Sequence, residues 1–361
     1  MGGVEFFSDN LALALSKRGA HVLIVTTDPC NAELERPFEI FRIPSRGLLA
    51  GRYPVFNAIQ ASKNVTALLK EQAINSYVIN GRFYELSRFG AKLARKNGAE
   101  PIVIDHSSSY VASTDSLLGK LLAIADHATT RCLNHYHPAY YCVSQLSSEW
   151  IRTFNIRSSG EIHNAIDAAS FTTNASSFQI APQSTAAIKV LYAGRLIEEK
   201  GVKKAIEAIK LTRSNAELFI AGSGPLEPYV QREANQDGRV HYLGRLNHPD
   251  LASTMIRSDI FCFPTEYGEG LPTSLLEAGA CGCALITTRT GGTAEIIPTD
   301  DHGVVLNSTA PDEIARQIDH LAEDRVRLNR MQAIIRNHVM HNFSWQNTVN
   351  ELLRALEAVS Q

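Results

Sequence analysis

The chain has 361 residues and a mass of 39.6 kDa, a length that suits two domains better than one core. Hydrophobic residues make up 44% and charged residues 20%, which excludes a disordered, collagenous or coiled-coil chain. The formal net charge of −2 predicts no strong field toward nucleic acid, so no nucleic-acid partner is expected. The sequence has no long apolar span and no signal peptide at its start, and we therefore expect a cytoplasmic protein.

The first half of the chain alternates short apolar runs with longer segments of helical spacing. A helix is predicted over Val4–Lys17. Because the apolar runs do not alternate with polar residues, they predict strands covered on both faces, as in a parallel sheet. These strands are predicted at Ala20–Thr26, Phe38–Ile43, Tyr77–Asn80, Pro101–Asp105 and Ala139–Ser144.

The second half repeats this pattern and ends in helices near Pro311–Glu323 and Arg325–His341, followed by one capped by Ser344. The segment Asp167–Ala187 has no helical or strand period and is interpreted as a linker. The strands are predicted at Ile188–Ala193, Ala216–Ala221, Arg239–Leu243, Asp259–Phe263, Cys283–Thr288 and Gly303–Val305. The predicted organisation is a domain at 1–166, a linker at 167–187, a domain at 188–342, and a helix at 343–361 that crosses back to the first domain.

The segment 264–282 follows a predicted strand and leads into a helix. Pro272 suits the first helical position, so the next three amides would be free donors at the positive end of the helix dipole, where a phosphate would bind. Glu269 and Glu277 can reach different parts of one ligand. An ordinary capped surface helix also explains acidic residues here, because they favour that end of a helix. The three amides belong to Thr273, Ser274 and Leu275.

A second motif, Gly194–Gly201, also lies directly after a predicted strand. Its turn brings together Arg195 and Lys200, two cations that could neutralise a diphosphate as it leaves. A solvated turn with weak surface pairs is the alternative. Two such turns at one edge of a parallel sheet favour a site, because ligands in open α/β sheets bind beyond the carboxyl ends of strands.

Other glycine turns follow neighbouring strands. Gly222-Ser223-Gly224-Pro225 is one, the backbone of Leu243–Leu246 could edge a planar base, and Gly291–Glu295 follows a later strand. None fits GxGxxG after a first strand, which argues against a dinucleotide oxidoreductase. The histidines and cysteines show no metal-binding spacing, so neither a metal nor a cofactor is predicted.

Two features of the first half could carry function. His106 lies just past a predicted strand, where it could hydrogen-bond a sugar hydroxyl or be a buried structural residue. Gly2 and Gly3 open a helix and could form another phosphate cradle, although a flexible terminus is the alternative. A basic helical face could contact an anionic membrane or acceptor, or could simply be solvated. This face consists of Arg88, Lys92, Arg95 and Lys96.

Taken together, these motifs resemble the retaining glycosyltransferases of family 4, the glycosyl transferases group 1. The resemblance rests on the Arg195–Lys200 turn, the Glu269-x7-Glu277 pair, GGTAE at 291–295 and FSW at 343–345, with GGVE at 2–5 and HNAID at 163–167 in the first half. It implies the α/β GT-B fold, in which two Rossmann-like, doubly wound parallel-sheet domains face a cleft.

The resemblance also implies residue roles. Arg195 and Lys200 would bind the donor diphosphate, Glu277 the ribose hydroxyls, and Glu269 and His106 would lie near the transferred sugar. No covalent nucleophile would be needed, and no metal either, since two cations and a helix dipole replace it. The nucleotide sugar would be a donor substrate rather than a cofactor. Further donor contacts are implied for Gly3, Gly194, Gly222, Leu246, Gly270, Leu271, Thr273, Ser274 and Leu275.

The expected reaction is transfer of a sugar from a nucleotide diphosphate to a glycan, lipid-linked or small-molecule acceptor. We expect it to take place in the cytoplasm or at the inner face of the membrane and to serve cell-envelope polysaccharide synthesis. In the resembled family, GGVE follows a central strand, so we expect the first domain to lack that strand. The alternatives are a nucleotide-sugar epimerase on the same fold and a sugar-nucleotide-binding protein with impaired catalysis.

Overall fold

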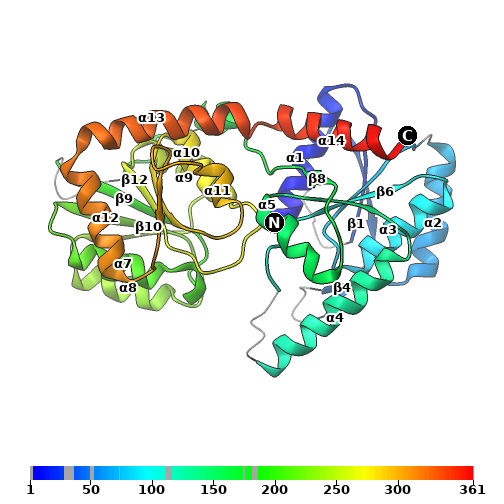
Figure 1. Cartoon of the computed structure of the whole chain (residues 1–361), viewed down its shortest axis with the longest axis horizontal. Coiled ribbons are helices and arrows are strands. Elements are labelled where there is room, and N and C mark those ends of the chain that lie inside the picture. The colour runs from blue at the N-terminus through cyan, green and yellow to red at the C-terminus, as the bar shows by residue number, and fades with distance from the viewer. Residues whose placement is uncertain are drawn as a thin grey trace. The chain divides into compact units, whose positions relative to one another are not determined.

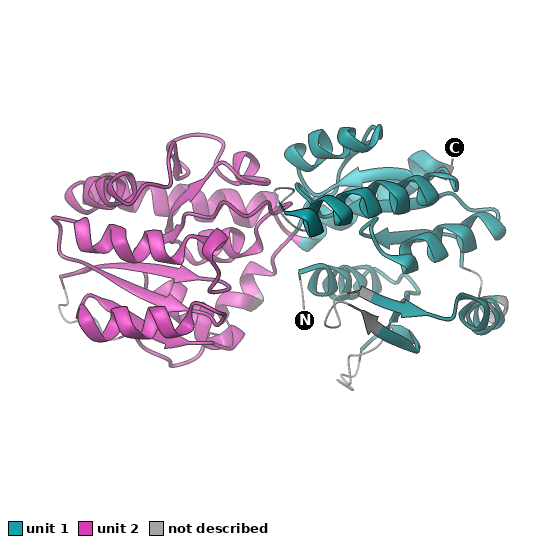
Figure 2. Cartoon of the chain, turned by 90° about the horizontal axis from the view of Figure 1, so that it is seen from below, with its two compact units in different colours: residues 1–164, 345–361 teal, residues 165–344 magenta. Residues whose placement is uncertain are grey.

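The computed structural model describes residues 3–27, 36–48, 53–72, 74–110, 116–173, 175–180 and 186–360. The chain folds into two compact units, shown in different colours in Figure 2. Unit 1 comprises Met1–Asn164 together with Trp345–Gln361, and unit 2 comprises Ala165–Ser344. Both are α/β units built around parallel strands.

Unit 2 contains one parallel sheet, which among the described residues has six strands in the order β11-β10-β9-β12-β13-β14. Every residue of β10, β12 and β13 is buried, which explains the unbroken apolar runs that predicted them. The strands are β9 (Ile188–Ala193), β10 (Ala216–Ala221), β11 (Val240–Gly244), β12 (Ile260–Phe263), β13 (Ala284–Thr288) and β14 (Val304–Leu306). All the strands predicted in this half are therefore confirmed within a residue or so.

Helices cover both faces of this sheet, as Figure 1 shows, with α7 packed against α12 and α10 packed against α9 and α13. The helices are α6 (Ala168–Thr173), α7 (Val202–Leu211), α8 (Glu227–Gln236), α9 (His248–Ile256), α10 (Thr273–Cys281), α11 (Thr293–Ile296), α12 (Pro311–Glu323) and α13 (Arg325–Asn342), with a short 3₁₀ turn, η2 (Glu198–Lys200).

Helix α6 lies in the segment 167–187, for which no helical structure was predicted. It packs against α9 and α10 of unit 2, and the ring of its Phe171 lies 6.3 Å from that of His248. Tertiary packing, rather than local sequence period, therefore stabilises this short helix.

The parallel strands of unit 1 form two separate sheets. One has the order β5-β6-β7-β8 and the other pairs β1 with β2, while β3 and β4 form an antiparallel hairpin. Short strands that contain Gly47 and Pro54 gave this hairpin no clear signal in the sequence. The strands are β1 (Leu23–Thr27), β2 (Glu39–Ile43), β3 (Ser45–Leu48), β4 (Tyr53–Phe56), β5 (Tyr77–Asn80), β6 (Pro101–Asp105), β7 (Ala139–Cys142) and β8 (Gly160–Glu161).

The break between the two parallel sheets lies between β1 and β5. Each of these strands is paired along one edge only within the described residues. They nevertheless share one core, because Val25 of β1 and Tyr77 of β5 pack against the same cluster, which includes Phe89 and Leu93.

The helices of unit 1 surround these sheets. The last helix packs against the first, with the rings of Phe7 and Trp345 5.5 Å apart and His163 Nδ1 3.0 Å from Glu351 Oε1. The helices are α1 (Gly3–Lys17), α2 (Ala58–Glu71), α3 (Glu85–Lys96), α4 (Leu117–Asn134), α5 (Gln145–Trp150), η1 (Ile151–Phe154) and α14 (Trp345–Ser360). Across the described ranges, no helix combines the length and the hydropathy that a membrane crossing requires.

Candidate functional site

The candidate site lies at the carboxyl ends of β9 and β12 in unit 2. From β9 the chain moves outward to β10 and β11, and it later returns to the other side of β9 at β12. Such a reversal of strand order opens a crevice in which open α/β sheets bind ligands. The two motifs predicted from the sequence, Gly194–Gly201 and the segment from Pro264 to Glu277, follow β9 and β12 directly.

Backbone contacts hold these two loops together. The amide of Glu266 donates to Glu199 O at 2.7 Å, and Thr265 Oγ1 donates to the same carbonyl at 3.2 Å. Gly201 has a φ of +78°, and a Cβ at this position would lie 2.1 Å from Pro264 O. Only glycine fits this close approach without displacing the loop that carries the two glutamates.

The other glycine turns support the same loops. A Cβ on Gly222 would lie 1.9 Å from Gly194 O, and one on Gly291 would lie 1.9 Å from Glu269 O. Gly292 N donates to Gly270 O at 2.7 Å. The turns at 222 and 291 therefore pack against the backbone of the two motif loops and fix their positions.

Lys200 is buried, with 8% of its surface exposed. Its Nζ lies 4.7 Å from the ring centroid of Tyr267 and 5.2 Å from that of Phe263, and it forms an ion pair with Glu269. Burial, assisted by the charge of Arg195, lowers the pKa of Lys200 to about 8. A pKa of about 8 lies above neutral pH, so Lys200 is mostly a cation at pH 7.

Arg195 is exposed and lies over the same aromatic ring, with its guanidinium carbon 5.8 Å from the Tyr267 centroid. In the part of the chain that the structure describes, no carboxylate pairs with Arg195. Arg195 and Lys200 therefore form a pair of cations around Tyr267. The sequence analysis missed Tyr267, and its position within the motif loop was the only signal that could have singled it out.

Helix α10 begins one residue later than predicted, because Pro272 is its N-cap rather than its first helical residue. Leu275 N donates to Pro272 O at 3.2 Å, so this amide takes part in the first turn and is not a free donor. The amides of Thr273 and Ser274 precede it at the positive end of the helix, where backbone donors have no intrahelical acceptor.

Glu277 lies within α10, about one turn from its start. Its side chain is partly buried, and this desolvation raises the pKa of its carboxyl group to about 7. Within the described ranges, no hydrogen bond or ion pair reaches Glu277. Glu277 is thus a desolvated acceptor whose hydrogen-bonding capacity is available to a ligand.

The remaining predicted residues of unit 2 lie around this edge. Gly194 and Gly222 belong to the loops after β9 and β10, while Gly270 and Leu271 precede α10, and Leu271 is buried with 3% exposed. Leu246 follows β11, which is two strands away from β9 in the sheet. Of the predicted donor contacts in this unit, it follows the strand that is farthest from β9 in the sheet order.

In unit 1, His106 follows β6 and is packed against other side chains. Its Nε2 lies 3.3 Å from Asn80 Oδ1, and its ring meets Phe7 edge to face at 4.7 Å. Burial lowers the pKa of His106 to about 4, so the imidazole is neutral at pH 7. Gly3 is the first residue of α1, and a Cβ there would have no atom within 4 Å, so no steric constraint requires glycine.

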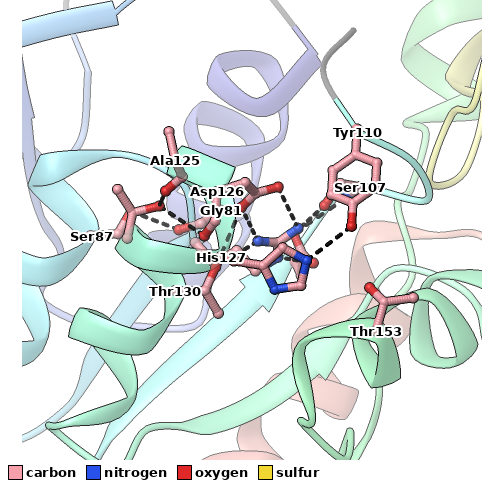
Figure 3. A network of polar contacts seen from close by, with 12 residues as sticks. Gly81, Ser87, Ser107, Tyr110, Ala125, Asp126, His127, Thr130 and Thr153 are labelled. Carbon is pink, nitrogen blue, oxygen red and sulfur yellow. Dashed lines mark hydrogen bonds and ion pairs between the residues drawn. The ribbon is translucent and has the colours of Figure 1, made fainter. Parts of the chain in front are cut away.

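A buried polar network adjoins His106, and Figure 3 shows it from close by. Arg82 Nε donates to Asp105 Oδ2 at 3.0 Å, while its Nη1 contacts Asp126 and donates to Thr130 Oγ1 at 2.7 Å. The guanidinium lies 3.7 Å from the ring centroid of Phe154. This network fixes the end of β6, from which the chain continues into His106. It was missed because a lone arginine after a short strand carries no distinctive pattern.

Metal ligands do not cluster in the described residues, since no group of three or more His, Cys, Asp or Glu side chains could hold an ion there. The described cysteines are free thiols.

Comparison with known proteins places these features in a family context. Residues 175–338 match the family described as glycosyl transferases group 1. The chain is 33% identical over 174 residues to the GDP-mannose-dependent monoacylated alpha-(1-6)-phosphatidylinositol monomannoside mannosyltransferase of Corynebacterium glutamicum, and this alignment covers 45% of each protein. It is 26% identical over 369 residues to one of the subunits of the phosphatidylinositol N-acetylglucosaminyltransferase of Arabidopsis thaliana, covering 96% of this chain and 76% of that protein.

Among solved structures, Anabaena HepE in complex with UDP has a TM-score of 0.73 at 14% identity, covering 99% of this chain and 96% of HepE. This likeness extends over both units and shows that the chain has the GT-B fold of two Rossmann-like units.

Proposed function

Because the chain belongs to the glycosyl transferases group 1, we propose that it transfers a sugar from a nucleoside diphosphate to an acceptor, with retention of anomeric configuration and without a metal ion. One observation carries this proposal. Two cations, Arg195 and Lys200, follow β9, and the carboxyl group of Glu277, which is unpaired within the described residues, lies on helix α10 after the neighbouring strand β12. This combination suits a ligand that has a diphosphate at one end and hydroxyl groups at the other.

The two cations would act on the leaving group. As the bond between the sugar C1 and the diphosphate oxygen breaks, negative charge grows on the diphosphate, and fixed cations stabilise that charge. Lys200 pairs with Glu269 in the free protein. A bound diphosphate would offer Lys200 a second anionic partner, which would weaken its pairing with Glu269.

The carboxylate and the helix would orient the nucleotide. Glu277 would accept hydrogen bonds from the ribose hydroxyls, and the amides of Thr273 and Ser274 would donate to a phosphate at the start of α10. Retention would follow if the acceptor hydroxyl attacks C1 from the face that the diphosphate leaves. The new bond would then join C1 to the acceptor oxygen, and the hydroxyl proton would pass to the departing diphosphate.

The role of unit 1 in this proposal is narrower. His106 is neutral at pH 7, so it would serve as a hydrogen-bonding group for a sugar hydroxyl rather than as a cation. The contact of Gly3 with the diphosphate remains a prediction.

We propose a lipid-linked acceptor, handled at the cytoplasmic face of a membrane. The support is that both curated relatives described above are named for transfer to phosphatidylinositol or its mannoside. The basic face of α3 would contribute to membrane contact through Lys92 and Lys96, which are exposed, and through Arg88, which pairs weakly with Glu85 at 3.8 Å. Arg95 instead donates to the carbonyls of Tyr136 and His137.

A donor panel tests the proposal. UDP-, GDP- and ADP-sugars are screened for binding by ligand-detected NMR, and the products formed from each binding donor are then followed over time. Release of nucleoside diphosphate with sugar transfer is expected, and Arg195→Ala and Glu277→Ala should each lower it sharply while the fold is retained. Interconversion of two nucleotide sugars would indicate an epimerase instead, and binding without turnover would indicate a sugar-nucleotide-binding protein.

A further inference from the structure

Tyr267 presents one aromatic ring to two cations. Lys200 Nζ lies 4.7 Å from the centre of this ring, and the guanidinium carbon of Arg195 lies 5.8 Å from it. Both distances fall within the roughly 6 Å over which the face of an aromatic ring attracts a cation. Tyr267 belongs to the loop after β12, whereas both cations follow β9, so the ring joins the two motif loops through their side chains.

The two cations repel each other, and the ring offsets this repulsion. The charge of Arg195 contributes to the lowered pKa of Lys200, so the two charges act on each other. The ion pair with Glu269 also holds Lys200. Arg195 is exposed, and among the described residues its guanidinium contacts the Tyr267 ring but no hydrogen-bond acceptor. The ring is therefore the group that keeps Arg195 beside Lys200.

Backbone hydrogen bonds hold Tyr267 in place independently of its ring. Its amide donates to Glu199 O and to Thr265 Oγ1, each at 3.1 Å. The amide of the preceding residue donates to the same Glu199 carbonyl at 2.7 Å. Replacing the side chain at position 267 leaves these bonds available, so the contribution of the ring can be measured apart from that of the loop.

A second tyrosine in unit 2 also lies between two cations. The ring centre of Tyr229, on α8, is 5.3 Å from Lys203 Nζ and 5.1 Å from the guanidinium carbon of Arg232. Here both cations already have carboxylate partners, which leaves them less able to attract a further anion. The partners are Glu198 for Lys203, at 2.7 Å, and Glu233 for Arg232, at 3.6 Å. Tyr229 is thus a matched reference for the ring at 267.

We propose that Tyr267 is a positioning residue for the donor, whose ring holds the Arg195 guanidinium beside the Lys200 ammonium so that a diphosphate meets both cations already in place. The inference rests on the proposed function, because it names what prepares the diphosphate end of that site. Ordering a long side chain in advance reduces the conformational entropy lost on binding. The ring is assigned no contact with the reacting bond, so its removal should raise the donor KM and leave kcat nearly unchanged.

Two substitutions at position 267 test the proposal. UDP, GDP and inorganic pyrophosphate are titrated calorimetrically into the full chain. Tyr267→Phe keeps the ring, and among the described residues the lost hydroxyl makes no hydrogen bond, so each Kd should stay within about twofold of wild type. Tyr267→Leu removes the ring and should raise Kd, and the donor KM, about 3-fold to 10-fold. A loss confined to kcat would contradict the positioning role.

A fluorinated series separates attraction to the ring from packing of the ring. Phenylalanine carrying no, one, two or three ring fluorines is incorporated at position 267. Fluorine withdraws negative charge from the face of the ring while changing its shape little, so the affinity should fall with each fluorine added. A ring that only packs would give the same Kd throughout. That result would overturn the proposal even if Tyr267→Leu proved unstable.

The control is Tyr229→Leu, which removes a half-buried ring between two cations outside the motif loops. It should leave Kd within about twofold of wild type, and an effect as large as that of Tyr267→Leu would overturn the proposal. Equal affinity of the wild type and Tyr267→Leu would also overturn it and leave the proposed function standing. A wild-type chain that binds none of the three probes would refute the proposed function and this inference together.

Discussion

The substitution Glu277→Gln should change protein stability and nucleotide binding in opposite directions. It keeps the shape of the side chain and removes its charge. In the free protein, Glu277 is a desolvated carboxyl group with no hydrogen-bonding partner in the described residues, and burial raises its pKa from 4.5 to about 7. We therefore expect the variant to be the more stable protein above neutral pH and the weaker nucleotide binder.

The size of the stability effect follows from the shift in pKa. Between about pH 4.5 and 7 the native state holds a proton that the unfolded state has lost, so the stability of the wild type falls as pH rises through this window. A shift of this size corresponds to at most about 3 kcal/mol at pH 8, and we expect about 1–2 kcal/mol because the side chain is partly exposed. Loss of charge-assisted hydrogen bonds to a ribose should weaken binding about 10-fold to 100-fold.

The assay is urea unfolding of the wild type and Glu277→Gln at pH 5 and pH 8, together with calorimetric titration of the nucleoside diphosphate identified by the panel. The stability gain should be larger at pH 8 than at pH 5. Glu207→Gln, on the exposed side of α7, is the control and should change neither property. A gain that is equal at both pH values, or a variant that binds nucleotide as tightly as wild type, would refute the reasoning.

Three further substitutions test separate parts of the structure. Lys200→Met should lower kcat about 10²–10³-fold in a donor turnover assay while the fold is retained, because one fixed cation at the diphosphate is lost; a loss of less than tenfold would contradict its role. Gly201→Ala should lower the unfolding free energy by about 1–3 kcal/mol more than the control Gly244→Ala. A Cβ at 201 would lie 2.1 Å from Pro264 O, whereas a Cβ at 244 meets nothing within 4 Å. Equal losses of unfolding free energy would show that the close approach is unimportant. Arg82→Met should lower the unfolding free energy of unit 1 by about 3–5 kcal/mol in a denaturant titration, because it leaves two carboxylates buried without their cation. An unchanged unfolding transition would show that the network is not needed for stability.

Much of the fold could be predicted from the sequence because most of the parallel strands are buried on both faces. The bounds of β5, β6, β9 and β10 agree with the predicted ranges to the residue. Their apolar runs are unbroken because helices cover both sides of each sheet. The hairpin of β3 and β4 and the short helix α6 could not be predicted, since each depends on contacts with distant segments rather than on a local period.

The candidate site was predictable as far as its loops are concerned. Arg195, Lys200 and Glu277 were predicted to lie at one edge of a parallel sheet because topology brings successive strand-to-helix turns together there, and the structure places them after the neighbouring strands β9 and β12. The pairing of Lys200 with Glu269 and the shared ring of Tyr267 were not predictable, because they depend on side-chain packing between two loops far apart in the sequence.

Unit 1 was harder to interpret from the sequence than unit 2. The network around Arg82 joins residues 44 positions apart, so no local pattern marks it. In the sequence, Leu117, Leu121 and Ile124 have the spacing of a core-facing helix side, but these side chains of α4 are exposed and Asp126 faces inward instead.

One measurement tests the central claim most directly: an NMR time course of the full chain with its nucleotide-sugar donor and a short-chain lipid-linked acceptor, resolving the anomeric signal of the product. The account predicts one nucleoside diphosphate released for each product formed, and a product with the anomeric configuration of the donor. It also predicts that Arg195→Ala abolishes both signals. A product of inverted configuration would contradict the proposed mechanism, and transfer that survives Arg195→Ala would contradict the site.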